Sequence, residues 1–241
     1  MNSAILILAG ILAGISATVA GIASVWSYPA LLLIGYSPID ANITNSISVA
    51  ALGFGAVGSS KREWIHHKRL IGRLAVATAL GGICGAVLLL NTSPNQFKAI
   101  VPYLILSATL LIWLPPRERF ASRRGAGLMW AVAFVIGIYA GYFGAGSGIM
   151  TIVLLIQMLS LDLVSAQAIK NVLIAIGNTV AAIIFITMGH VHWGAVIPLA
   201  IGFYCGGYIG PKILRRTNQT LAKALVTCLG VGLSISLVVG N

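Results

Sequence analysis

Charged side chains make up only 8% of this 241-residue chain, and that scarcity constrains the fold more than any other feature. A water-soluble domain usually carries about 25% charged residues, because its surface faces water. The chain is also 59% hydrophobic, with a mean hydropathy of +1.00. These values exclude a water-soluble globule and predict an all-α polytopic membrane protein, with the lipid bilayer as its first partner.

The apolar runs have the length that membrane crossing requires. A helix needs about 20 apolar residues to cross the hydrocarbon layer, because it rises about 1.5 Å per residue. Two runs, 3–35 and 125–160, would reach roughly 50 Å as unbroken helices, well beyond a core of about 30 Å. We therefore expect each of them to be a broken or re-entrant helix. The single-span candidates are 41–60, 70–90, 99–114, 165–188, 193–211 and 220–239.

Small residues lie in the middle of both long runs. The first run contains Ala20-Gly21-Ile22-Ala23-Ser24, and the second contains Gly144-Ala145-Gly146-Ser147-Gly148. Glycine permits the sharp turn and the close backbone approach that a break requires. The sequence predicts that in each run a helix is followed, after these residues, by a shorter second helix.

The two long runs hold matching places in an internal repeat. Matches at fixed offsets extend over more than forty positions, which is not expected by chance. The pairs are Gly14 with Gly141 and Gly21 with Gly148 at an offset of 127, then Ala41 with Ala166, His67 with His192, Gly81 with Gly206 and Gly85 with Gly210 at 125. The sequence therefore predicts two related halves, 1–114 and 125–241, joined by a cytoplasmic linker at 115–124.

Basic residues gather in short loops, which favours a cytoplasmic location for those loops. In the first half they lie in 61–73 and in the linker 115–124, so that 91–98, between them, is outside. In the second half the counterpart of the first basic loop, 189–193, has no Lys or Arg, whereas the counterpart of the outside loop is basic around 212–216. This inversion predicts an inverted repeat with both termini outside. A parallel arrangement of four spans per half stays open.

Paired interrupted helices at matching places are typical of transporter binding sites. The second arm of a broken helix exposes unpaired N–H groups, whose partial positive charge suits an anion. Polar residues cluster around both breaks, although back-bonded hydroxyls and packing glycines would give part of the same pattern. The predicted substrate-binding residues are Ser24, Trp26, Ser27, Tyr28, Asn45, Ser46, Gly146, Ser147, Gly148, Thr151, Lys170, Asn171 and Asn178. Asn42, Thr44 and Gln167 belong to the same polar clusters.

Lys170 is the most informative single residue. It lies well inside the 165–188 span, where an ammonium group is costly unless it is paired or hydrated. The four acidic residues fall in loops or at segment ends, so we expect a small substrate anion to be its partner. The alternative is a lysine that extends to the membrane interface. In the repeat, Lys170 corresponds to Asn45, so the charge is present in one half only.

Other chemistry lacks support in the sequence. The carboxylates form no pair for hydrolysis, and Glu63 and His67, four residues apart, have no evident third ligand for a metal. No nucleotide-binding loop is present, and the three cysteines lie in apolar segments. Loop orientation accounts for most of the net charge of +11, which in a soluble protein would indicate nucleic acid. We expect no enzyme activity, no cofactor, no metal site and no nucleic-acid partner.

The residues at the breaks carry a family resemblance. They are Gly144-Ala145-Gly146-Ser147-Gly148 and Ala166-Gln167-Ala168-Ile169-Lys170-Asn171 in the second half, and Ala20-Gly21-Ile22-Ala23-Ser24, Pro29-Ala30-Leu31 and Asn45-Ser46 in the first. In these residues, and in the two-half layout of nearly the whole chain, the sequence resembles the sulfite exporter TauE/SafE family. The first half departs from the family's usual glycine-rich run at Ile22, Ala23 and Trp26.

This resemblance implies a carrier for small sulfur-containing anions, such as sulfite or organosulfonates, in the cytoplasmic membrane. It does not fix the direction of transport. With no deep carboxylate to carry protons, we expect export driven by the membrane potential. An anion channel, and a membrane-embedded subunit or scaffold that transports nothing itself, remain alternatives.

Overall fold

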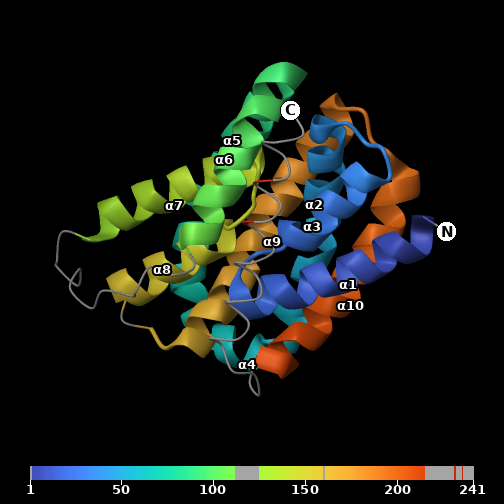
Figure 1. The fold of residues 1–241 in the computed structure, drawn as a ribbon. Helices are drawn as coiled ribbons and strands as arrows, with labels where there is room; N and C mark the ends of the chain where they lie inside the picture. The colour runs from blue at the N-terminus through green and yellow to red at the C-terminus, as the bar shows by residue number, and fades with distance from the viewer. Residues whose placement is uncertain (1, 112–124, 160, 215–230, 232–234, 236–241) are drawn as a thin grey trace.

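The computed structural model describes residues 2–111, 125–159, 161–214, 231 and 235, and within these residues the chain is helical and contains no β-strand (Figure 1). The elements are α1 (Asn2–Ala20), α2 (Ser24–Leu33), α3 (Pro38–Ser59), α4 (Lys61–Trp64), the 3-10 helix η1 (Ile65–His67), α5 (Lys68–Leu90), α6 (Pro94–Leu111), α7 (Gly125–Tyr142), α8 (Ser147–Leu159), α9 (Leu163–Met188) and α10 (Trp193–Leu214).

Four apolar stretches are long enough to cross a membrane: α1, the α4–α5 stretch Lys61–Leu90, α9 and α10. The predicted spans 41–60, 70–90, 165–188 and 193–211 agree with α3, α5, α9 and α10 to within a few residues. α3 is not one of the four apolar stretches, because polar residues lie near its start. The predicted span 220–239 and the linker 115–124 lie outside the described residues.

The predicted span 99–114 begins too late. Helix α6 starts at Pro94, because Ser93 and Gln96 cap it reciprocally. The Ser93 backbone N–H donates to Gln96 Oε1 at 3.3 Å, and the Gln96 N–H donates to Ser93 Oγ at 3.3 Å. The capping residues are polar, so a search for apolar runs passes over this first turn.

Both long apolar runs are broken where small residues were expected. Helix α1 ends at Ala20 and the shorter α2 begins at Ser24, while α7 ends at Tyr142 and the shorter α8 begins at Ser147. The turns use left-handed backbone at Gly21 (φ 81°) and at Gly144 and Gly146 (φ 78° and 77°). A side chain strains that backbone, so glycine is the residue that allows each helix to stop and restart.

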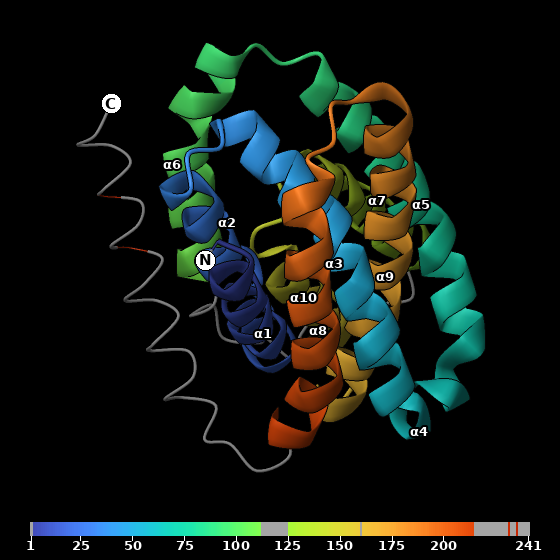
Figure 2. The same ribbon diagram turned by 90° about the vertical axis from the view of Figure 1, so that its right-hand side faces the viewer.

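The first arm of each broken helix packs on a helix that is distant in sequence. Helix α1 lies along α10, and α7 lies along α5 (Figure 2). Glycines allow this close approach: a Cβ added at Gly14 would lie 2.9 Å from the Cα of Gly206, and one added at Gly137 would lie 3.0 Å from the Cα of Thr78. α3 and α9 contact one another at the centre of the molecule, with α10 and α5 on either side.

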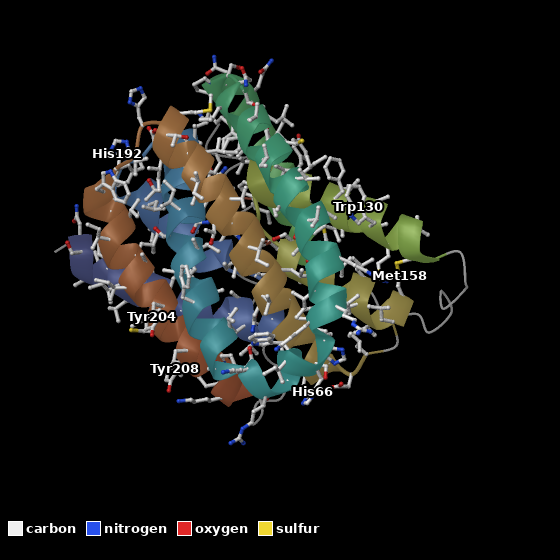
Figure 3. The ribbon with its side chains drawn as sticks, turned by 180° about the vertical axis from the view of Figure 1, so that it is seen from behind. His66, Trp130, Met158, His192, Tyr204 and Tyr208 are labelled. Carbon is white, nitrogen blue, oxygen red and sulfur yellow. The ribbon has the colours of Figure 1, made fainter. Side chains whose placement is uncertain are left out.

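The long helices run in two directions. His192, just before α10, lies at one end of the molecule, while His66, just before α5, and Tyr208, near the end of α10, lie at the other (Figure 3). α3 and α10 therefore run one way, and α5 and α9 run the opposite way. At the His192 end, the loops before α3 and α10 touch through the rings of Tyr36 and His192, whose centroids are 4.9 Å apart.

Large apolar side chains remain exposed along the outer faces of the helices. Phe54 is 69% exposed, Leu8 61%, Val135 61% and Ile197 55%. In water such a surface would drive association, whereas lipid chains are a suitable solvent for it. Most of the buried polar side chains in the described part of the chain lie on α2, α3, α8 and α9.

Candidate functional site between the two helix breaks

The two helix breaks meet in the interior of the molecule. A Cβ added at Gly148 would lie 2.5 Å from the carbonyl oxygen of Gly21, and one added at Gly21 would lie 2.9 Å from the backbone nitrogen of Ile149. Ile22 and Ile149, both buried, pack in one small apolar cluster beside the contact. The starts of α2 and α8, more than a hundred residues apart in sequence, are therefore neighbours.

A small cavity of about 30 Å³ lies where the breaks meet. This volume accommodates about one or two water molecules. Helices α3 and α9 complete its wall, and Val49, Leu52, Phe143 and Ile174 form its apolar side. Its polar side chains are Ser24, Asn45, Ser46, Ser147, Lys170, Asn171 and Asn178.

The start of α2 faces this cavity without a side-chain cap. Its N-cap residue is Ala23, which has no oxygen to accept the first N–H groups of the helix. The start of α8 differs, since Ser147 N–H donates to the Gly144 carbonyl at 3.2 Å. The open N-terminus of α2 thus contributes a partial positive charge to the cavity wall.

Lys170 is 1% exposed, and its ammonium does not reach the surface. Its Nζ donates to the carbonyl oxygen of Ala17 at 2.7 Å, and Gln167 Nε2 donates to that of Val19 at 3.0 Å. Both acceptors belong to the last turn of α1, whose carbonyls carry partial negative charge; the carbonyl of Ala17 also accepts from the Gly21 N–H at 3.0 Å. Lys170 therefore contacts a helix end in the structure, and an ammonium with three donors keeps two for the small anion that the sequence predicts as its partner.

A matching contact holds the end of the other broken helix. Asn42 Nδ2 donates to the carbonyl oxygen of Tyr142, in the last turn of α7, at 2.8 Å. Asn42 and Gln167 are 125 positions apart, the offset found in the sequence. α3 therefore caps α7, and α9 caps α1. The sequence analysis did not assign Asn42 or Gln167 to the site, although the amide duplicated at one offset was a usable signal.

The predicted site residues divide into two groups. Those that line the cavity are Ser24, Asn45, Ser46, Ser147, Gly148, Lys170, Asn171 and Asn178. The cavity wall also includes Gly21 and Gly144, which the sequence analysis assigned to the breaks, and apolar residues that it gave no role. Apolar wall residues have no signal in a membrane sequence, because apolar residues occur everywhere in it.

Ser27 stands behind the cavity wall. Its hydroxyl donates to Asn45 Oδ1 at 2.6 Å, and Asn45 Nδ2 donates to Ser24 Oγ at 3.2 Å. The amide of Asn45 is thereby held at both ends. Because the Ser24 oxygen accepts this bond, its own hydrogen is left to donate toward the cavity.

The other predicted residues lie outside the cavity wall. Trp26 Nε1 donates to Ser16 Oγ at 2.9 Å, which ties α2 back to α1. Tyr28 is buried with its ring edge-on to Phe143, at 5.8 Å between centroids. Thr151 Oγ1 donates to the Ser147 carbonyl at 2.8 Å, and Gly146 belongs to the turn before α8. These four residues support the breaks and do not face the cavity.

The charges of the site favour an anion. Among the described residues that line the cavity, Lys170 is the one charged side chain. No group of three His, Cys, Asp or Glu residues that could hold a metal is found in the described part of the chain. The site can offer an ammonium, hydroxyls, amides and the open start of α2 to a small ligand.

A helical, multi-pass membrane protein with a polar cavity between two interrupted helices belongs to the class of membrane transporters. Within that class, the chain belongs to the sulfite exporter TauE/SafE family, whose sequence model matches residues 6–237. The resemblance seen at the helix breaks is thus confirmed over nearly the whole chain.

The relatives of the chain are described as transporters. It is 25% identical to the probable membrane transporter protein YfcA of Escherichia coli strain K12, over 97% of this chain and 88% of that protein. It is 26% identical to a probable membrane transporter protein of Haemophilus influenzae, over 98% of this chain and 94% of that protein. No solved structure matches the chain significantly.

Proposed function

We propose that the chain is a secondary transporter that moves small sulfur-containing anions, sulfite or organosulfonates, outward across the cytoplasmic membrane. The observation that carries this proposal is that Lys170 and the uncapped start of α2 line the same cavity. The name of the family supports the sulfur chemistry. The binding site is the cavity between the two helix breaks.

The electrostatics of the cavity support an anion as the cargo. A buried ammonium and a helix N-terminus both favour negative charge, and they act more strongly inside a membrane protein than in water. The small volume of the cavity, about 30 Å³, fits a resting state that must widen to admit even a small anion. Widening requires the helix ends that meet there to move.

We further propose that the halves, 1–114 and 125–241 with the linker 115–124, are inverted repeats with both termini outside. The corresponding helices α3 and α9 run in opposite directions, as do α5 and α10 (Figure 2). The contact between Gly21 and Gly148, which are equivalent positions, is expected where a twofold pseudo-axis passes. A parallel repeat would make equivalent helices run in the same direction.

The membrane potential is sufficient to drive export of an anion. Moving one negative charge outward across 100 mV, inside negative, releases about 2.3 kcal/mol. At about 1.4 kcal/mol per factor of ten, this sustains roughly a fifty-fold concentration gradient. Export therefore requires no coupling ion.

Purified protein in liposomes tests the proposal. Flux of sulfite, sulfate, thiosulfate and small sulfonates is measured with and without an imposed potential, and protein-free liposomes give the leak. We expect saturable, potential-sensitive flux with counterflow for at least one sulfur anion. Flux without saturation or counterflow indicates a channel, and no flux for any anion indicates a scaffold or subunit; either result overturns the transporter proposal.

A further inference from the structure

One polar atom of the cavity, the amide oxygen of Asn171, cannot form a hydrogen bond with a fully deprotonated anion. Asn171 is 2% exposed and lines the cavity, and its Oδ1 has no hydrogen-bond partner within the described part of the chain. An amide oxygen accepts hydrogen bonds and cannot donate them. A buried acceptor without a donor is costly, and a fully deprotonated anion would bring only further acceptors to it.

Each of the other two amides of the cavity makes a hydrogen bond within the protein. Asn45 Oδ1 accepts from the Ser27 hydroxyl at 2.6 Å, and Asn178 Nδ2 donates to the Ile174 carbonyl at 3.0 Å. Among the described lining residues, Asn171 Oδ1 is therefore the fully buried acceptor left for a ligand to satisfy. The ligand must itself carry a donor to do so.

The charge of the cavity sets a second requirement. Lys170 is the one charged side chain among the described lining residues, and it already donates to the Ala17 carbonyl. The open start of α2 adds about half a positive elementary charge, and the end of α1 that Lys170 contacts brings about half a negative one. The total of about one positive charge matches one negative charge, whereas a dianion would leave an uncompensated charge inside the protein, which is costly.

We propose that the transported species is a small monoanion that keeps a hydroxyl group, such as hydrogen sulfite. Its unprotonated oxygens face Lys170 and the start of α2, and its hydroxyl donates to Asn171 Oδ1. This inference rests on the proposed function and narrows it, because sulfonates lack the hydroxyl and sulfite dianion carries the second charge.

A matched pair of anions tests this proposal. Hydrogen sulfite and methanesulfinate are monoanions with the same sulfur–oxygen group, but a methyl replaces the hydroxyl in methanesulfinate. Both fluxes are measured in proteoliposomes near neutral pH, where hydrogen sulfite is abundant, with the leak of protein-free liposomes subtracted. We expect wild-type protein to prefer hydrogen sulfite by about tenfold or more, because a buried acceptor left unpaired penalises the analogue.

The Asn171→Leu variant tests whether the amide oxygen of Asn171 causes the preference for hydrogen sulfite. In this variant the preference should fall to near parity, because leucine has no acceptor to satisfy. Asn91→Leu is the matched control: it makes the same amide-to-leucine change at an exposed position at the end of α5, outside the cavity wall, so the preference should persist. A second check on the wild type is the pH profile, in which sulfite flux should fall at alkaline pH as the dianion replaces hydrogen sulfite.

The possible results separate this inference from the proposed function. Equal flux of the two anions in wild-type protein overturns the inference and leaves anion transport standing, and so does sulfite flux that rises at alkaline pH. A preference that survives Asn171→Leu overturns the role of Asn171, and so does a preference that collapses equally in Asn91→Leu. Absence of flux for these anions and for the wider panel overturns the proposed function and this inference with it.

Discussion

Lys170 is shared between the protein and its proposed cargo. Its ammonium bonds to the Ala17 carbonyl at the end of α1 and lines the cavity in which an anion would bind. An anion that draws the ammonium toward itself weakens its hold on α1. The same side chain can therefore bind the cargo and release the broken helix.

Replacing Lys170 by methionine keeps the length and packing of the side chain and removes its charge. We expect anion flux to fall by about 100-fold or more, the range for truncating one partner of a buried charged contact. Flux in proteoliposomes measures this loss, with size-exclusion chromatography as a check on folding. Lys98→Met, at an exposed position on α6, is the control and should transport normally. Substantial flux in Lys170→Met would contradict the assigned role.

The depth of Lys170 could be predicted from the sequence, but its partner could not. Depth follows from the position of a residue within an apolar run. Its partner is a backbone carbonyl, and every residue has one, so the sequence contains no mark that distinguishes Ala17 or Val19. The same reason hid the capping roles of Asn42 and Gln167, which act on carbonyls of helices from the other predicted half.

At the scale of elements, the contact between the two breaks sets the shape of the site. Gly148→Ala would place a methyl group 2.5 Å from the Gly21 carbonyl, and rigid backbone cannot yield as a side chain would. We expect a loss of about 1–3 kcal/mol of stability from overpacking and at least a tenfold loss of flux. Thermal unfolding and flux measure the two effects.

Gly194→Ala is the matched control for this substitution. Gly194 also lies in a helix, α10, but no atom of the described residues lies within 4 Å of an added Cβ. Its stability and flux should stay near those of the wild type. If the Gly148 variant behaves like this control, the two breaks do not form the tight contact described above.

The start of α9 depends on an ionised carboxylate. Hydrogen bonds from the side chain and backbone of Ser165, together with one from the Val164 N–H, hold the pKa of Asp162 below its usual value of 3.8. Because the folded-state pKa is the lower one, the stabilisation is complete above pH 3.8 and is lost as the pH falls through the folded-state pKa.

Asp162→Asn tests this cap. Asparagine caps helices about as well as aspartate but does not titrate. We therefore expect similar melting temperatures near pH 7 and a steeper fall on acidification in the wild type than in the variant. Thermal unfolding in detergent from pH 7 to pH 3 measures the difference, and parallel curves would contradict the role of the charge.

Most helices could be predicted from the sequence because a helix that crosses lipid must be long enough and apolar enough to span the hydrocarbon layer. The breaks were predictable for a second reason, since glycine-rich segments interrupted runs too long for the bilayer. The start of α6 was missed because its capping residues are polar. The sequence also does not show which helices pack together, because the glycines of α1 and α10 would allow close packing against several other helices.

At the scale of the whole molecule, the proposed inverted arrangement predicts on which side of the membrane each loop lies. Single cysteines are placed in a background without Cys84, Cys205 and Cys228, and labelled in intact cells with an impermeant maleimide. We expect labelling from outside at Gln96→Cys and His190→Cys, and labelling only after permeabilisation at Lys68→Cys and Lys212→Cys. Outside labelling of Lys212→Cys would exclude the inverted arrangement and favour the parallel one.

The packing of α1 on α10 has a consequence for how the protein is made. α1 is synthesised first, yet the helix that covers its glycine face is synthesised near the end of the described chain. During translation the glycine face of α1 therefore stays unpaired in the membrane until α10 is made. In the same way, the face of α5 that packs on α7 stays unpaired until α7 is made. Neither predicted half contains the packing partner of its own first helix. A gene fragment encoding one half should therefore yield no stable protein, whereas two complementary fragments expressed together could assemble, because each supplies the helix that the other lacks.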